Sequence, residues 1–155
     1  EQEWRHTLRL LDYFGQHCRE IILIKGNHDT ILGPIAKKRN VRLLEHFKLG
    51  NILVIHGDKI PDKGLLKDVK TIIIGHEHPA VSVREGARAE LFKAFLVGKW
   101  KKYNIIVQPS FNLVTEGTDV LKEEVLSQFL KNNLGNFEAV VVGDKLYRFG
   151  KLNYF

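Results

Sequence analysis

The sequence predicts a single α/β domain over residues 1–155, built on a mixed sheet or on two packed sheets. Continuous apolar runs, typical of strands covered on both faces, occupy residues 21–24, 52–55 and 71–74. Beyond residue 79 the segments alternate in polarity, which predicts antiparallel strands. The 155 residues are 44% hydrophobic, which suits one domain with its own core, because domains cluster at about 100 to 150 residues.

A helix is predicted first. Residues 3–16 place Trp4, Leu8 and Leu11 on one face at helical spacing. Gly15 stands where such a helix would end.

Short strands and turns follow this helix. Up to residue 74 they are a strand at 21–24, a hairpin or two consecutive strands over 41–48 and 52–56, one or two helical turns at 65–70, and a strand at 71–74. The second half predicts antiparallel strands at 81–83, 89–97 and 103–107, a helix at 119–132 with Asp119 as its N-cap, and a closing hairpin of 137–142 with 146–149 around Gly143-Asp144.

Composition narrows the class of protein. No apolar run reaches the roughly 18 residues of a membrane span, and the N-terminus has no signal-peptide pattern, so we expect a soluble, cytoplasmic protein with no membrane partner. The single cysteine, Cys18, cannot form an internal disulfide and agrees with a reducing compartment. A net charge of +6 mildly favours anionic partners.

Residues that bind metals or protons follow each of the three apolar runs. The runs lead into Gly26-Asn27-His28-Asp29, into His56-Gly57-Asp58, and into Gly75-His76-Glu77-His78. Each segment alone has a simpler explanation, namely a turn, a histidine at a strand end, or exposed loop histidines. Three such segments at strand ends, where α/β sheets usually bind ligands, instead favour a site.

The donor types in these segments suit a transition metal. The candidate ligands are Asn27, His56, His76 and His78, which offer neutral nitrogen and oxygen atoms of the kind that Mn, Fe and Zn accept. In an extended segment His76 and His78 would point to one locus, because alternate side chains share a face. With the backbone bent at Gly75, they would instead serve two adjacent metals.

The motifs GNHD, an isolated histidine after an apolar strand, and GHEH, in this order, resemble the last three of five signature motifs of the calcineurin-like metallophosphoesterases. The segments VKTIIIGHEHPAVSV and VQPSFN are similar to a prokaryotic, largely archaeal branch of predicted phosphohydrolases related to the phosphoesterase associated with DNA ligase. The resemblance implies a two-sheet sandwich flanked by helices and a metal-dependent phosphoester hydrolase.

The resemblance also implies a role for each residue. Asn27, His56 and His76 would bind one metal of a binuclear pair and His78 the other, with Mn favoured over Zn or Fe. His28 would contact the substrate phosphate or protonate the leaving oxygen, a role suited to histidine because its pKa is near neutrality. Asp29 would orient a neighbour in the site or form the turn. Two adjacent cations stabilise in-line displacement at phosphorus.

The first two motifs of the family, D-x-H and G-D-x-x-D, are missing. Gly57-Asp58-Lys59-Ile60-Pro61-Asp62 is one residue too long for the second motif and lies downstream of GNHD. The chain begins at Glu1 and contains no methionine, so we expect an N-terminally truncated chain. Such a chain would hold one metal or none and show little activity alone, because the bridging carboxylate is absent.

The substrate and partners stay open at this point. A phosphodiesterase or nuclease is slightly favoured over a phosphomonoesterase, with nucleic acid or a nucleotide as the substrate. Lys99, Trp100, Lys101 and Lys102 interleave cations with aromatic rings, as nucleic-acid surfaces do, although a solvated lysine-rich loop is the commoner explanation. The alternatives are a nucleic-acid-binding module with a silent site, or a subunit that pairs with a partner through an exposed sheet edge.

Overall fold

The computed structural model describes residues 2–112 and 114–154. Its first elements are α1 (Gln2–His17), β1 (Ile22–Ile24), α2 (Leu32–Lys38) and β2 (Arg42–Leu44). They are followed by β3 (His46–Leu49), β4 (Ile52–Ile55), β5 (Thr71–Ile74), β6 (Pro79–Glu85), β7 (Arg88–Trp100), β8 (Tyr103–Val107) and β9 (Thr118–Asp119). The chain closes with the 3-10 helix η1 (Leu134–Asn136), β10 (Glu138–Val142), β11 (Leu146–Lys151) and the 3-10 helix η2 (Leu152–Tyr154). The α/β class is confirmed.

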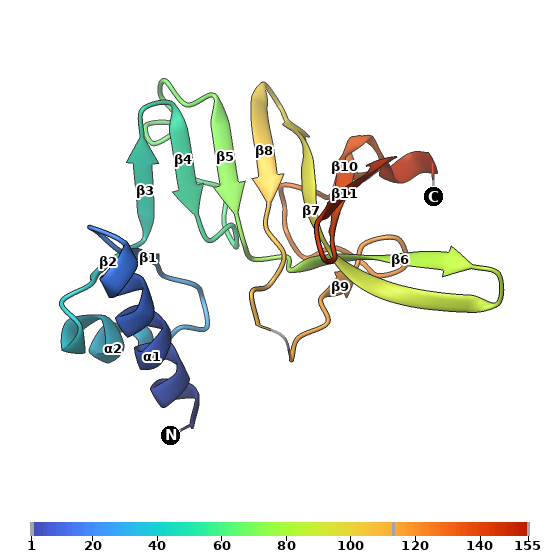
Figure 1. Cartoon of the computed structure of the whole chain (residues 1–155). Helices are drawn as coiled ribbons and strands as arrows, with labels where there is room; N and C mark the ends of the chain where they lie inside the picture. The colour runs from blue at the N-terminus through green and yellow to red at the C-terminus, as the bar shows by residue number, and fades with distance from the viewer. Residues whose placement is uncertain (1, 113, 155) are drawn as a thin grey trace.

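The first four elements form a small N-terminal lobe (Figure 1). Helix α1 buries the predicted apolar face through Leu8 and Leu11, which pack with Ile35 of α2. The helix continues through Gly15 and ends at His17. Strand β1 pairs in parallel with β2 in a two-stranded sheet and is half-buried, so the prediction of a strand covered on both faces was wrong here. Helix α2 was not predicted.

The larger part of the chain forms one nine-stranded mixed sheet. Its main path runs β11-β10-β7-β8-β5-β4-β3, and β6 pairs with both β7 and β9. Strands β3 and β4 form a hairpin around Gly50-Asn51, while the predicted antiparallel strands and the closing hairpin are all present. Strands β4 and β5 alternate between buried and half-buried residues, so they too are covered fully on one face only.

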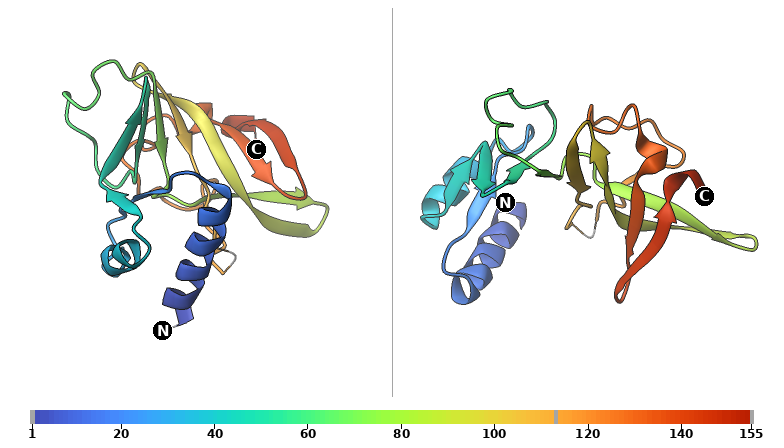
Figure 2. Two further views of the ribbon diagram at one scale, coloured as in Figure 1. Left: turned by 60° about the vertical axis from the view of Figure 1, so that its left-hand side comes forward. Right: turned by 90° about the horizontal axis from the view of Figure 1, so that it is seen from above.

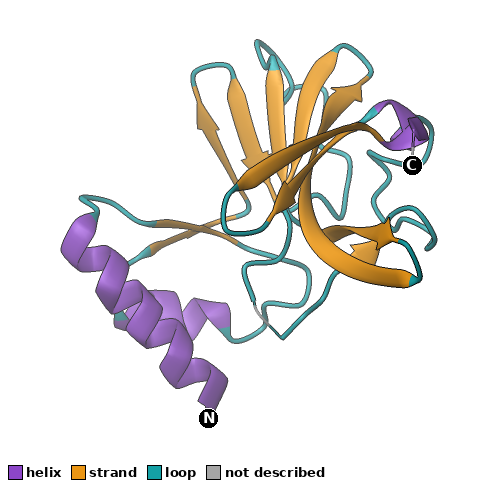
Figure 3. Cartoon of the chain, turned by 45° about the vertical axis from the view of Figure 1, so that its right-hand side comes forward, coloured by secondary structure: helices purple, strands orange, loops and turns teal. Residues whose placement is uncertain are grey.

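The large sheet and the helices α1 and α2 occupy opposite ends of the molecule (Figure 3). The two further views show that the closing hairpin β10–β11 forms the edge of the large sheet that is farthest from α1 (Figure 2). Leu53, Ile72, Leu96 and Ile105 are fully buried in the main core. Among the described residues, no helix is both long and apolar enough to cross a membrane.

The predicted helix at 119–132 was wrong, because this segment forms consecutive turns. The amides of Leu126 and Ser127 donate to the carboxylate of Glu77, at 3.2 and 2.6 Å, rather than to carbonyls one helical turn earlier. The capping interactions persist without the helix: Asp119 Oδ1 accepts from the amide of Leu121 at 3.2 Å, and the amide of Asp119 donates to Glu123 at 2.8 Å. Residues 63–68 form turns, in the region where one or two helical turns were predicted. The amide of Leu66 donates to the carbonyl of Asp62 at 3.3 Å, as in a single helical turn.

Strands β4, β5 and β8 run in the same direction, and Figure 1 shows their arrowheads pointing toward the end of the sheet next to the N-terminal lobe. His56 directly follows β4, and Gly75 directly follows β5. The segments after these strands therefore emerge together at that end of the sheet, as parallel strands require.

Candidate active site at the strand ends

The three motif segments meet in one pocket, although β1 belongs to a different sheet from β4 and β5. Its volume is about 490 Å³. The carbonyl of His56 accepts hydrogen bonds from the amides of Gly75 and His76, at 3.0 and 2.9 Å, which fixes the second and third segments side by side. The pocket is lined by Gly26, Asn27, His28, Asp29, His56, Gly75, His76, His78 and Leu126.

Three predicted ligand atoms are in direct contact. The Nε2 atom of His56 lies 2.9 Å from Asn27 Oδ1 and 3.1 Å from His76 Nδ1. A ring nitrogen carries either a proton or a lone pair. His56 Nε2 therefore cannot donate to Asn27 while accepting from His76. A cation among the three atoms would accept a lone pair from each of them.

The spacing of these atoms fits one divalent metal. Ligands at about 2.1 Å from a metal and at right angles to each other lie about 3.0 Å apart, close to the observed separations. One amide oxygen and two imidazole nitrogens suit Mn, Fe or Zn. Among the described residues, no three His, Cys, Asp or Glu side chains cluster closely enough to hold a metal by themselves. Asn27 is therefore essential to this set, and the set carries no negative charge.

Two histidines in the pocket favour the neutral form. Burial lowers the pKa of His56, and His76 lowers it further, against weaker opposing effects of Asp58 and Asp29. Burial likewise lowers the pKa of His78, with additional contributions from His76 and Lys93. Neutral imidazole is the form that binds metals, so the pocket keeps these rings ready for a cation near neutral pH.

The GHEH segment is a turn, so of the two alternatives the backbone is bent rather than extended, and His76 and His78 do not share a face by alternation. His78 has a φ of 51°, in the left-handed region. This turn is held by Thr118, whose amide donates to the carbonyl of His78 at 3.0 Å and whose hydroxyl donates to that of Glu77 at 3.1 Å. Of the two histidines in this segment, only His76 contacts His56 directly. His78 lines the exposed wall of the pocket.

The GNHD segment is also a turn. The carboxylate of Asp29 accepts a hydrogen bond from the amide of Gly26 at 2.7 Å, so Asp29 closes the turn, which is one of its two predicted roles. A Cβ on residue 26 would lie 2.7 Å from Asp29 Oδ2 and 3.1 Å from His56 Cε1. Glycine is thus required here for close approach rather than for its backbone freedom. His28 is exposed and lines the pocket.

Glu77 is a site residue that the sequence reasoning did not single out. Its side chain is 2% exposed and binds the amides of Leu126 and Ser127. The hydroxyl of Ser127 donates to the carbonyl of Gly57 at 3.3 Å, so one loop supports the segments after both β4 and β5. The sequence feature that could have indicated Glu77 is its position, as a carboxylate between two histidines. Nothing local in the sequence indicates that Leu126 reaches the pocket.

Lys99, Trp100, Lys101 and Lys102 are not part of this pocket. They lie at the turn between β7 and β8, where Trp100 pairs with Tyr103. That turn is beside Lys70, which precedes β5, because the amide of Asn104 donates to the carbonyl of Lys70 at 2.9 Å. The lysine-rich turn therefore lies at the end of β5 opposite the histidines.

Comparison of the chain with models of known protein families finds no match, and comparisons with curated proteins and with solved structures find none either.

Proposed function

We propose that this chain is a metal-dependent phosphoester hydrolase of the metallophosphoesterase type, with its α/β fold corresponding to the two-sheet sandwich of that family. The observation that carries the proposal is the convergence of Asn27 Oδ1, His56 Nε2 and His76 Nδ1 within 2.9 and 3.1 Å. These residues follow strands of two different sheets. A metal ion bound by all three would explain why their polar atoms meet.

Asn27, His56 and His76 would hold one divalent metal, with Mn favoured over Zn or Fe. His78 lines the exposed wall of the same pocket, and it would bind the second cation only in a complete binuclear site. A bound divalent cation would supply positive charge to phosphate oxygens and lower the pKa of a water molecule. Because the set includes no carboxylate to offset the charge of the cation, the affinity for metal would be lower than that of a site with a bridging carboxylate.

His28 would transfer a proton to the leaving oxygen or donate a hydrogen bond to the phosphate. Its position in the adjoining turn, exposed and lining the same pocket, supports this role. A general acid of this kind contributes about 10²- to 10⁴-fold to a reaction rate. A phosphodiester, which carries less charge per phosphate than a monoester, suits a site with few positive groups better.

The test is hydrolysis of bis(p-nitrophenyl) phosphate and of p-nitrophenyl phosphate with added Mn²⁺, for the wild type and for His28→Ala, His56→Ala and His46→Ala. His46 is exposed on β3 outside the pocket and is the matched control. We expect slow, chelator-sensitive hydrolysis of the diester that His56→Ala abolishes and that His46→Ala leaves unchanged. His28→Ala should reduce it through loss of the hydrogen bond to the phosphate, whereas loss of proton transfer should matter little for p-nitrophenolate, which leaves as an anion. Hydrolysis that persists in chelator, or in His56→Ala, would contradict the proposal.

A further inference from the structure

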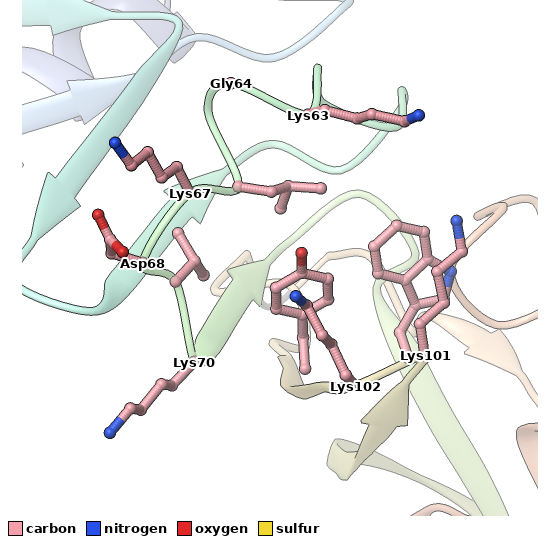
Figure 4. Close-up of a pocket in the computed structure, with 11 residues that line it drawn as sticks. Lys63, Gly64, Lys67, Asp68, Lys70, Lys101 and Lys102 are labelled. Atoms are coloured by element: carbon pink, nitrogen blue, oxygen red, sulfur yellow. The ribbon is translucent and has the colours of Figure 1, made fainter.

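A second pocket, of about 880 Å³, lies at the opposite end of strands β4, β5 and β8 from the histidines (Figure 4). One wall is the turn segment 63–70 before β5, and the other is the turn between β7 and β8. Its lining includes five lysines and one acidic residue, Asp68. We call it the lysine pocket, after Lys63, Lys67, Lys70, Lys101 and Lys102.

The charge of the lysine pocket is not neutralised within the described residues. Among residues 2–112 and 114–154, the ion pairs involve cations outside the pocket, and none of the five ammonium groups donates a hydrogen bond to a protein acceptor. In the view of Figure 4, the ammonium group of Lys102 lies near the centre, those of Lys63 and Lys101 lie to one side of it, and those of Lys67 and Lys70 lie to the other. Like charges gathered around a concavity raise the local concentration of anions.

Two of these lysines rest on aromatic rings. The Nζ of Lys101 lies 4.5 Å from the centre of the Trp100 ring, and that of Lys102 lies 5.5 Å from the centre of the Tyr103 ring. The two rings stack with their centres 5.8 Å apart, and Phe129 packs against Trp100 at 4.8 Å. Cation–π contact restrains the ammonium groups, so less side-chain entropy is lost when an anion binds.

The same contacts restrict what the pocket recognises. Trp100 already contacts Tyr103, Phe129 and Lys101, and Tyr103 is only 8% exposed, so neither ring offers an open face to a nucleobase. Recognition therefore falls to the ammonium groups, which bind phosphate as point charges. A concave site between two turns admits a flexible single strand, whereas a rigid duplex would contact only its edges.

We infer that the lysine pocket binds the phosphate backbone of single-stranded nucleic acid without reading the bases. This inference does not rest on the proposed hydrolase function, because the pocket contains no proposed metal ligand and binding there requires no metal. Binding should follow the salt dependence of phosphate contacts, with a logarithmic slope of about −0.7 per contact for a single strand.

The test is fluorescence anisotropy of fluorescein-labelled (dT)₂₀ and (dA)₂₀ with the full chain in EDTA, between 50 and 200 mM NaCl. We expect equal affinity for both oligonucleotides within about threefold, and a weaker affinity for the duplex that they form. In Lys101→Gln/Lys102→Gln the salt slope should fall in magnitude by about 1.4, from two lost contacts. Lys63→Gln/Lys67→Gln, on the other wall, should have a similar effect.

The matched control is Lys145→Gln/Lys151→Gln, which removes the same charge from exposed positions on the β10–β11 hairpin. Lys145 also rests on an aromatic ring, 5.2 Å from the centre of Tyr147, so the control includes a cation–π lysine. Its slope should equal that of the wild type. An equal loss of slope in the control, equally tight duplex binding, or equally effective competition by polyglutamate would overturn the inference. Loss of hydrolysis alone would bear only on the proposed function.

Discussion

Each side chain of the GNHD turn has its own physical task. Gly26 allows the turn to approach the ring of His56, Asn27 brings an oxygen to that ring, and Asp29 closes the turn through the amide of Gly26. The glycine could be predicted, but only part of the reason for it, because one of its two close contacts is made by a residue 30 positions later in the chain. Local sequence shows the turn, and only the assembled loops show the contact.

Asp119 gives a prediction for the dependence of stability on pH. Its side chain is 6% exposed. Desolvation raises its pKa, but hydrogen bonds from Ser82, the amide of Leu121 and Lys122 outweigh this effect and hold the pKa below its ordinary value of 3.8. A lowered pKa means that the ionised carboxylate stabilises the folded state above about pH 3.8. This stability is lost as the pH falls through the still lower pKa of the folded state.

Urea unfolding at pH 6 and pH 3 measures this effect. Asp119→Asn should lose about 1 to 3 kcal/mol at pH 6, since it weakens hydrogen bonds to a charged acceptor, and less at pH 3. Asp62→Asn, at an exposed position, is the control and should lose little at either pH. An equal loss for Asp119→Asn at both values of pH would show that its charge does not stabilise the fold.

The segment 119–132 shows how a buried side chain overrides local propensity. Its sequence has an N-cap and helical composition, and both capping interactions form. The carboxylate of Glu77 nevertheless accepts hydrogen bonds from the amides of Leu126 and Ser127, which lie 49 and 50 residues later in the chain. A buried carboxylate must be hydrogen-bonded, and the two amides meet that need at the expense of the helix.

Glu77→Gln tests whether this network holds the segment. Glutamine has the same shape but one oxygen in place of two, so one amide loses its acceptor and a buried NH₂ gains no partner. We expect a loss of about 2 to 3 kcal/mol in the free energy of unfolding, measured with urea. Faster hydrogen exchange at the amides of Leu126 and Ser127 should accompany it.

Glu124→Gln, at an exposed position of the same segment, is the control and should change the free energy of unfolding by less than about 0.5 kcal/mol. If Glu77→Gln were as stable as the wild type, or gained helical circular dichroism without losing stability, the network would not be what prevents the helix.

At the scale of the whole molecule, periodicity was enough to predict α1, the closing hairpin and the strands of the large sheet other than β9, whose residue Asp119 was expected to cap a helix. The rule that ligands bind at strand ends correctly predicted that His56 and His76 lie close together, because β4 and β5 are parallel neighbours. The position of β1 could not be predicted, since its pairing with β2 depends on α1 and α2 packing into a separate lobe. The lysine pocket could not be predicted either, since it depends on the pairing of β5 with β8, which places Lys70 next to the turn after Trp100.

The proposed metal site joins both parts of the molecule: Asn27 comes from the N-terminal lobe, and His56 and His76 follow strands of the large sheet. Calorimetric titration of Mn²⁺ into the protein at pH 7.5 tests this directly, because it does not depend on the substrate. We expect one weak site per chain, lost in Asn27→Ala, His56→Ala and His76→Ala and retained in His46→Ala. The absence of binding to the wild type, or undiminished binding to His56→Ala, would contradict the account.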